Sequence, residues 1–171
     1  MKLSDFIVSE AIVPQLEATE RDAAINELVD SVIKAGVADA SIREELIKAI
    51  LEREKKGSTG FGKGVAVPHV KHVKITKMAA TIGVSQKGVD FNALDKEPVY
   101  SVVLLLSPLD KPDDHLQAME NIFSNLQKDT FRRFLRQATR VQKPGQMQHS
   151  KPGKPVVALS GKPALTILSL T

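Results

Sequence analysis

Residues 99–106, which read VYSVVLLL, form an almost unbroken run of apolar and β-branched side chains. Such a run predicts a strand that is buried on both faces, because a strand with one face in water alternates polar and apolar residues. A sheet that contains this strand needs cover on each side. Amphipathic helical patterns precede and follow the run, so we expect an α/β domain with a mixed β-sheet flanked by helices.

Two helices are predicted before residue 57. In the first, Thr19 is the expected N-cap, with Asp22 completing an imperfect capping box, and Gly36 is expected to end the helix. The second is expected to begin at a full capping box in residues 41–44 and to run to about Lys55. Both carry apolar residues at helical spacing: Ile25, Leu28, Val29, Val32 and Ile33, then Ile42, Leu46, Ile47, Ile50 and Leu51.

The middle of the chain changes to strand patterns. Residues 65–67 (VAV) and 78–84 (MAATIGV) are each predicted to form a strand. Asp110, Pro112 and Asp113 then predict the start of a third helix. Its expected buried face is Leu116, Met119, Ile122, Phe123 and Leu126. Thr130 is expected to cap a last amphipathic helix that carries Phe131, Phe134, Leu135 and Ala138.

Charge is distributed unevenly between two parts of the chain. Residues 140–171 contain five Lys or Arg and no Asp or Glu, whereas residues 1–139 contain 19 basic and 20 acidic residues. We expect one domain in 1–139 and a Pro/Gly/Lys-rich tail in 140–171 that is a linker or a small hairpin. The domain is nearly neutral and aromatic residues make up only 4% of the chain, so specific nucleic-acid binding is not expected.

Several classes of function are disfavoured by composition. The chain has no cysteine, which excludes disulfides and thiolate chemistry. Its longest strongly apolar run is too short to span a bilayer, and the N-terminal residues do not resemble a signal peptide. We therefore expect a cytoplasmic protein with no direct membrane insertion.

The segment GSTGFGKGVAVPH, residues 57–69, is the strongest candidate for a functional site. Its first eight residues include four glycines, which can expose backbone N–H groups that bind anions, phosphate above all. Pro68 fixes the chain direction before His69, which is expected at the end of the 65–67 strand, where α/β sheets tend to expose their sites. The segment lacks the Walker A pattern, so ATP binding is not expected.

The other candidate side chains carry weaker signals when taken one at a time. By itself, His115 is expected on a helix surface, and Arg53 at a solvated helix end. His72 and His149 have no supporting context. His69 and His72 could supply two metal ligands, but no third ligand has convincing spacing, so no metal site is predicted.

Three segments together resemble the enzyme IIA domain of the fructose/mannitol/nitrogen-regulatory class of the bacterial phosphotransferase system. They are LEREKKGSTGFGKGVAVPH (51–69), LLLSP (104–108) and DDHLQAMENIFSNL (113–126). The resemblance runs from about residue 1 to residue 138. It departs from the family at Val70, where many relatives carry Gly or Ala, and in the tail, which replaces the usual last helical segment.

The resemblance implies a role for each matching residue. His69 corresponds to the histidine that accepts a phosphoryl group from phospho-HPr, Arg53 to the arginine that helps to bind this group, and His115 to a second histidine that is not phosphorylated. The phosphoryl-binding loop would comprise Gly57, Ser58, Thr59, Gly60, Gly62 and Gly64. The expected partners are an HPr-like phosphocarrier and an enzyme IIB domain or a regulatory target, and no cofactor or metal is implied.

The expected chemistry needs a neutral imidazole. If one ring nitrogen of His69 donates to a carbonyl, the other is left free as the nucleophile, and Arg53 and the loop N–H groups can compensate the charge of the phosphoryl group. Three functions remain open at this stage: a carrier that feeds sugar uptake, a regulatory module controlled by its phosphorylation state, and a non-catalytic binding protein with a basic tail.

Overall fold

The computed structural model describes residues 1–138 and is organised around strand β5 (Val99–Pro108). On one side, β5 pairs antiparallel with β4 (Ala79–Val89). On the other it pairs parallel with β2 (Val65–Ala66) and, further along, with β3 (His69–His72), while β1 (Gly60–Gly62) pairs antiparallel with β2. Every residue of β5 except Tyr100 is buried, which confirms the doubly buried strand predicted from its sequence.

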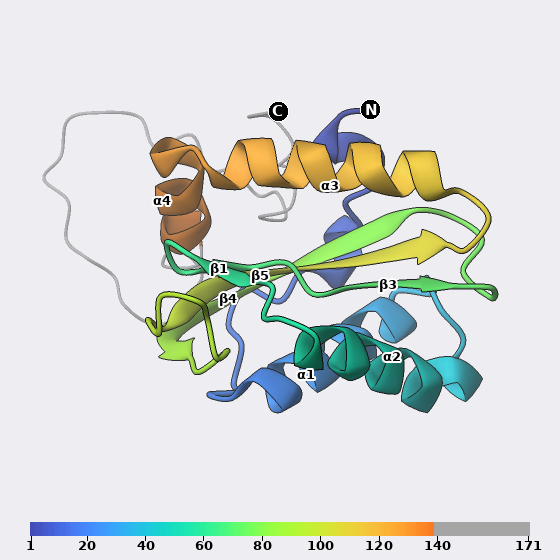
Figure 1. The fold of residues 1–171 in the computed structure, drawn as a ribbon, viewed down its shortest axis with the longest axis horizontal. Coiled ribbons are helices and arrows are strands. Elements are labelled where there is room, and N and C mark those ends of the chain that lie inside the picture. The colour runs from blue at the N-terminus through green and yellow to red at the C-terminus, as the bar shows by residue number, and fades with distance from the viewer. Residues whose placement is uncertain (139–171) are drawn as a thin grey trace, which may run out of the picture.

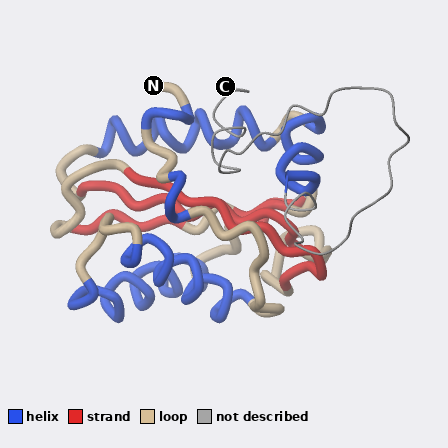
Figure 2. Tube along the Cα trace, turned by 180° about the vertical axis from the view of Figure 1, so that it is seen from behind, coloured by secondary structure: helices blue, strands red, loops and turns tan. Residues whose placement is uncertain are grey.

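Helices cover both faces of this mixed sheet, as predicted (Figure 1). Helices α1 (Arg21–Lys34) and α2 (Arg43–Lys55) lie on one face, and α3 (Pro112–Leu126) and α4 (Asp129–Ala138) lie on the other; the view from behind shows the same three layers (Figure 2). Two hydrophobic cores result, one on each side of the sheet. Their largest fully buried side chains are Ile25, Leu28, Ile42, Leu46, Ile50, Phe91, Leu104 and Leu106 on the first side, and Ile82, Leu105, Ile122 and Leu126 on the second.

The N-terminal segment covers the outer edge of β4, which the sequence analysis did not predict. It contains the short 3-10 turns η1 (Leu3–Asp5) and η2 (Ser9–Ala11). Backbone N–H groups of Val8, Val13 and Leu16 donate to carbonyl oxygens of β4 at 2.8, 2.9 and 2.7 Å. The segment therefore satisfies backbone groups that an open sheet edge would leave exposed.

Three predicted helix caps are wrong. The N-cap of helix α1 is Glu20, not Thr19, and its side chain makes no capping hydrogen bond. Before α2, the cap is Asp39, which accepts a hydrogen bond from the Ser41 N–H at 2.8 Å and starts the turn η3 (Ala40–Ile42). Helix α4 starts at Asp129, which places Thr130 inside the helix. The N-cap position of α2 itself is Ile42, and its side chain makes no capping hydrogen bond either. The predicted ends at Gly36 (φ +81°) and Lys55 are confirmed.

The predicted buried face of α3 is out of register by about one residue at its N-terminal end. Leu116 is 60% exposed, whereas His115, Ala118, Ile122 and Leu126 are buried. The predicted set that begins at Leu116 and the observed buried set that begins at His115 both have the spacing of one helical face. Apolar character alone favoured the set with Leu116, because His115 is polar. The rotation of α3 turns His115 toward the sheet, where it enters the candidate site.

Candidate functional site

His69 is held by the backbone that precedes it. Pro68 separates β2 from β3, so His69 is the first residue of a new strand rather than the end of the predicted one. Its Nδ1 lies 2.8 Å from the carbonyl oxygen of Val67. A carbonyl oxygen can only accept a hydrogen bond, so Nδ1 carries the proton and the lone pair of the neutral ring is on Nε2. His69 therefore has the carbonyl partner that the sequence analysis considered, and Nε2 is available as a nucleophile.

The surroundings keep this ring neutral. Burial lowers the pKa of His69 below its ordinary 6.5, and the positive charges of Arg53 and Lys71 lower it further. The hydrogen bond to Val67 and the negative charge of Glu54 oppose this shift without cancelling it. A neutral imidazole near pH 7 is the form whose free nitrogen can attack phosphorus.

His115 lies beside His69 at the N-terminal end of α3. The centroids of the two rings are 5.5 Å apart and their planes are tilted by 51°. His115 is buried, so the expectation of a surface histidine is wrong. Burial, followed by the nearby His69 and Lys71, lowers the pKa of His115 to about 4. Its Nδ1 lies 2.6 Å from the hydroxyl oxygen of Ser107 in β5.

Arg53 reaches the glycine segment from the last turn of α2. Its Nη1 donates to the carbonyl oxygen of Gly57 at 3.0 Å, and its charge acts on His69. The next residue, Glu54, is buried and accepts hydrogen bonds from both the N–H and the hydroxyl of Thr59. The carbonyl of Thr59 in turn accepts from the N–H of Val67 at 3.2 Å. Glu54 is thus connected through Thr59 to the peptide that orients His69.

The glycine segment is partly a hairpin rather than a continuous open loop. Gly60 and Gly62 belong to β1, and the turn contains Lys63 (φ +59°) and Gly64 (φ +73°). A Cβ on Gly60 would lie 3.0 Å from the Cβ of Ala93, so this glycine also has a packing function. The N–H groups of Thr59 and Gly60 already donate to Glu54 and to the hydroxyl of Ser58. The anion-binding function of this loop remains a prediction.

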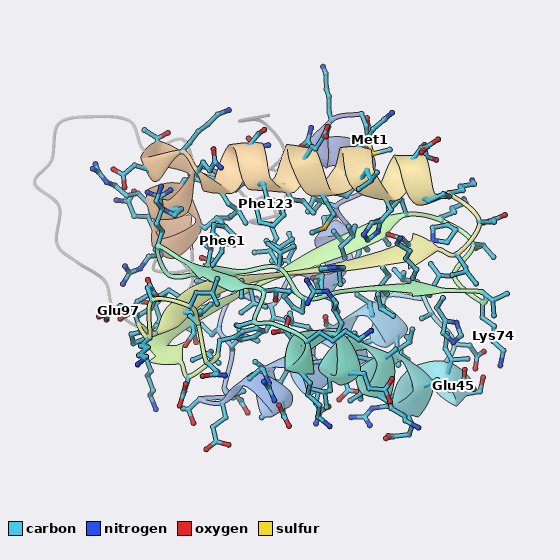
Figure 3. All side chains as sticks on the ribbon, viewed as in Figure 1. Met1, Glu45, Phe61, Lys74, Glu97 and Phe123 are labelled. Carbon is cyan, nitrogen blue, oxygen red and sulfur yellow. The ribbon has the colours of Figure 1, made fainter. Side chains whose placement is uncertain are left out.

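One aromatic contact anchors the hairpin to the helical layer. The rings of Phe61 and Phe123 have centroids 5.0 Å apart, and Figure 3 shows both side chains between β1 and α3. This contact puts the Phe61 side chain of β1 against the hydrophobic core on the α3 side of the sheet. It thereby links the hairpin to the helix that carries His115.

Two residues near the site were not identified from the sequence. Lys71 lies two positions after His69 in β3. Since residues two apart in a strand point to the same face, the strand period could have predicted that Lys71 lies on the side of His69. Ser107, which contacts His115, is one of two serines in the mostly apolar strand β5, and only the packing of α3 on β5 reveals its partner.

The remaining histidines lie elsewhere. His72 contacts Glu45 at 2.9 Å, and Figure 3 shows Glu45 and Lys74 at the edge of the molecule. His149 is outside the described residues. Within residues 1–138, no three His, Asp or Glu side chains are grouped so that they could hold a metal ion. None of the helices in this part of the chain is long and apolar enough to cross a membrane.

The family model described as "Phosphoenolpyruvate-dependent sugar phosphotransferase system, EIIA 2" matches residues 5–143. The chain belongs to this family and is a phosphoryl carrier of the phosphotransferase system. This conclusion agrees with a site that places a neutral histidine beside an arginine, a lysine and a second histidine.

Relatives with two kinds of name are similar to this chain. A PTS system fructose-specific EIIABC component of Bacillus subtilis is 31% identical over 138 residues, which are 81% of this chain and 21% of that protein. A nitrogen regulatory protein of Bradyrhizobium diazoefficiens is 34% identical over 122 residues, 71% of this chain and 78% of that protein. Among solved structures, the complex of enzyme IIAMTL and phosphorylated enzyme IIBMTL from Escherichia coli has the same fold, with a TM-score of 0.66, 18% identity and coverage of 96% of this chain and 97% of that one.

Proposed function

We propose that Nε2 of His69 accepts the phosphoryl group. The observation that carries this proposal is the 2.8 Å contact from Nδ1 to the Val67 carbonyl, which leaves the lone pair on Nε2. The lowered pKa of His69 supports it, because the neutral ring is the nucleophilic form. In the proposed mechanism the protein contributes mainly position and charge, which is what a loose phosphoryl-transfer transition state needs.

The transfer balances without a co-reactant. The Nε2 lone pair of His69 forms a bond to phosphorus while the phosphorus–nitrogen bond of the donor phosphohistidine breaks. The electron pair of the broken bond returns to the donor ring, and the proton of His69 stays on Nδ1, hydrogen-bonded to the Val67 carbonyl. Transfer to an acceptor runs through the same steps in reverse, with the bond at Nε2 breaking.

Three side chains are proposed to compensate the negative charge that arrives on His69. Arg53 and Lys71 both act on the charge of the His69 ring, and a phosphoryl group attached there would attract them. His115 would donate a hydrogen bond from its second ring nitrogen. The loop residues Gly57, Ser58, Thr59, Gly60, Gly62 and Gly64 are proposed to complete the phosphoryl-binding region.

The proposed donor is an HPr-like phosphocarrier, and the proposed acceptor is an enzyme IIB domain in the cytoplasm. The Escherichia coli structure with the same fold is a complex with phosphorylated enzyme IIBMTL, which supports an acceptor of this kind. We also propose that residues 1–139 are sufficient as the carrier domain.

Regulation by phosphorylation state is the alternative use of the same site. The relative named nitrogen regulatory protein supports it, since it matches most of its own length to this chain. The two uses differ in the fate of the phosphoryl group. Rapid transfer from the labelled protein to an enzyme IIB domain would favour the carrier that feeds uptake, whereas a stable label that changes the binding of a regulatory target would favour the alternative.

Labelling with phospho-HPr, followed by mass spectrometry, tests the proposed acceptor. One acid-labile phosphoryl group per chain is expected on the wild type and none on His69→Ala. His72→Ala is the matched control, because it removes a histidine three residues later in the same strand, and its labelling should be nearly unchanged. Labelling that survives His69→Ala and disappears with His72→Ala or His115→Ala would overturn the proposal.

A further inference from the structure

The hydroxyl of Ser107 connects the second histidine to the interior of the sheet. Its oxygen lies 2.6 Å from Nδ1 of His115 and 3.0 Å from Sδ of Met78. Ser107 is completely buried and His115 nearly so, which shields the contact from competing water. The hydroxyl has one proton to donate, so it must choose between the ring nitrogen and the sulfur.

The choice fixes the tautomer of the neutral His115 ring. If the Ser107 hydroxyl donates to Nδ1, this nitrogen carries the lone pair and Nε2 carries the proton. If the hydroxyl donates to Sδ of Met78, Nδ1 carries the proton and donates to the Ser107 oxygen, and Nε2 has the lone pair. Only the first arrangement gives His115 a hydrogen-bond donor on the nitrogen that remains available to the site.

We propose that Ser107 is a positioning residue that keeps the proton of neutral His115 on Nε2, where it can donate to a phosphoryl group on His69. A thioether sulfur is a weak acceptor and an imidazole nitrogen a good one. The 2.6 Å distance also lies within the range of bonds that an O–H donates to oxygen, about 2.5–3.0 Å, and below that of N–H···O bonds, about 2.7–3.2 Å. Both facts direct the hydroxyl proton to Nδ1. The inference rests on the proposed function for its consequence, and on this contact alone for the tautomer.

The same hydroxyl can serve a protonated His115. A phosphoryl group on His69 would bring negative charge next to the second ring and favour its protonation. Nδ1 would then donate to the Ser107 oxygen, and the hydroxyl proton could turn to Sδ of Met78, which is 3.0 Å away. The Nε2–H donor is retained in both protonation states. Ser107 and Met78 together therefore allow His115 to gain a proton without leaving a buried polar group unsatisfied.

The tautomer can be read directly by long-range ¹H–¹⁵N NMR of the unphosphorylated protein at pH 7. We expect His115 to show a protonated Nε2 and an unprotonated Nδ1. Met78→Leu keeps a similar volume and removes the competing acceptor, so the His115 signals should keep the same tautomer. A protonated Nδ1 in the wild type, or a change of tautomer in Met78→Leu, would overturn the proposal.

Removal of the hydroxyl provides the second readout. In Ser107→Ala, His115 should become a mixture of tautomers, and phosphorylation by phospho-HPr should slow by about ten-fold, the effect of one lost hydrogen bond. Ser101→Ala is the matched control, since Ser101 is also a buried serine of β5, and it should change neither quantity. A normal rate and an unchanged tautomer in Ser107→Ala would contradict the inference. If this variant does not fold, the NMR of the wild type and Met78→Leu still decides.

Failure of this inference can be distinguished from failure of the proposed function. The tautomer of His115 is measured without any phosphoryl donor. If the wild type shows the expected His115 tautomer but the His69→Ala variant is still labelled, the proposed acceptor is wrong and the inference about Ser107 stands. If the protein is labelled only on His69 but Nδ1 of His115 carries the proton, the proposed acceptor stands and the inference about Ser107 is wrong.

Discussion

His69 and His115 are neighbouring imidazoles whose orientation depends on different kinds of partner. His69 is oriented by the backbone carbonyl of Val67, which no side-chain substitution can remove. His115 is oriented by the Ser107 hydroxyl, which a single substitution removes. The proposed acceptor is therefore fixed by the course of the chain through Pro68, whereas the supporting histidine is fixed by packing of α3 against β5.

The largest effect is expected for Arg53, the cation next to the acceptor. Arg53→Ala removes a charge-compensating donor and should slow phosphorylation on the order of ten to a thousand-fold. Arg53→Lys keeps the charge but loses the planar fork, so part of the loss should remain. Initial rates with phospho-HPr measure both, and Lys56→Ala, at a nearby exposed lysine, is the control. Transfer at the wild-type rate by Arg53→Ala would show that its assigned role is wrong.

The next effect concerns the support beneath the backbone of His69. Glu54→Ala leaves the buried N–H and hydroxyl of Thr59 without their acceptor, which should lower the free energy of unfolding by about 1–3 kcal/mol. Urea denaturation measures the loss, with the exposed Glu52→Ala as the control. A Glu54→Ala protein as stable as the control would mean that the peptide carrying Val67 and His69 is held in another way.

The acid sensitivity of His115 should distinguish the two histidines further. Its pKa is lowered to about 4 in the folded protein, so the unfolded chain binds more protons between that value and 6.5. Stability contributed by the neutral ring is therefore present above about pH 6.5 and lost as the pH falls toward 4. His115→Gln should lose less stability than the wild type between pH 7 and 4.5, by about 2 kcal/mol. Equal losses in urea titrations would contradict the buried, neutral state of His115.

The smallest effect is expected from the tail. Its linker-like composition and its lack of any proposed site residue predict that deletion of residues 143–171 leaves a folded domain that phospho-HPr still labels. Labelling rate and urea midpoint should both stay close to those of the full chain. Complete loss of soluble protein on truncation would contradict this prediction and would show that the tail is part of the core.

Sequence alone predicted the parts of the fold that depend on local pattern. The apolar run at 99–106 required a doubly covered strand, and β5 with its flanking helices has this form. The Pro68–His69 pair and the nearby Arg53 pointed to one site, and the structure brings Arg53, His69 and His115 together. These features could be predicted because each depends on residues that are close together in the sequence or on a specific motif.

The features that were missed depend on contacts between distant segments. The N-terminal segment pairs with β4 some seventy residues later, and its sequence has no strand pattern. The burial of His115 depends on the rotation of α3, which the apolar residues of the helix left ambiguous. Ser107 gains its significance only from His115 across the turn between β5 and α3. Register and rotation are set by packing as a whole, so a local pattern does not determine them.

The most direct test of the account is ³¹P and ¹⁵N NMR of the uniformly ¹⁵N-labelled protein after phosphorylation by phospho-HPr. The account predicts one phosphohistidine, with phosphorus coupled to Nε2 of His69 and with the proton still on Nδ1, bonded to the carbonyl of Val67. Phosphorus on Nδ1 of His69, or on any nitrogen of His115 or His72, would contradict the central claim that the backbone selects the reactive nitrogen.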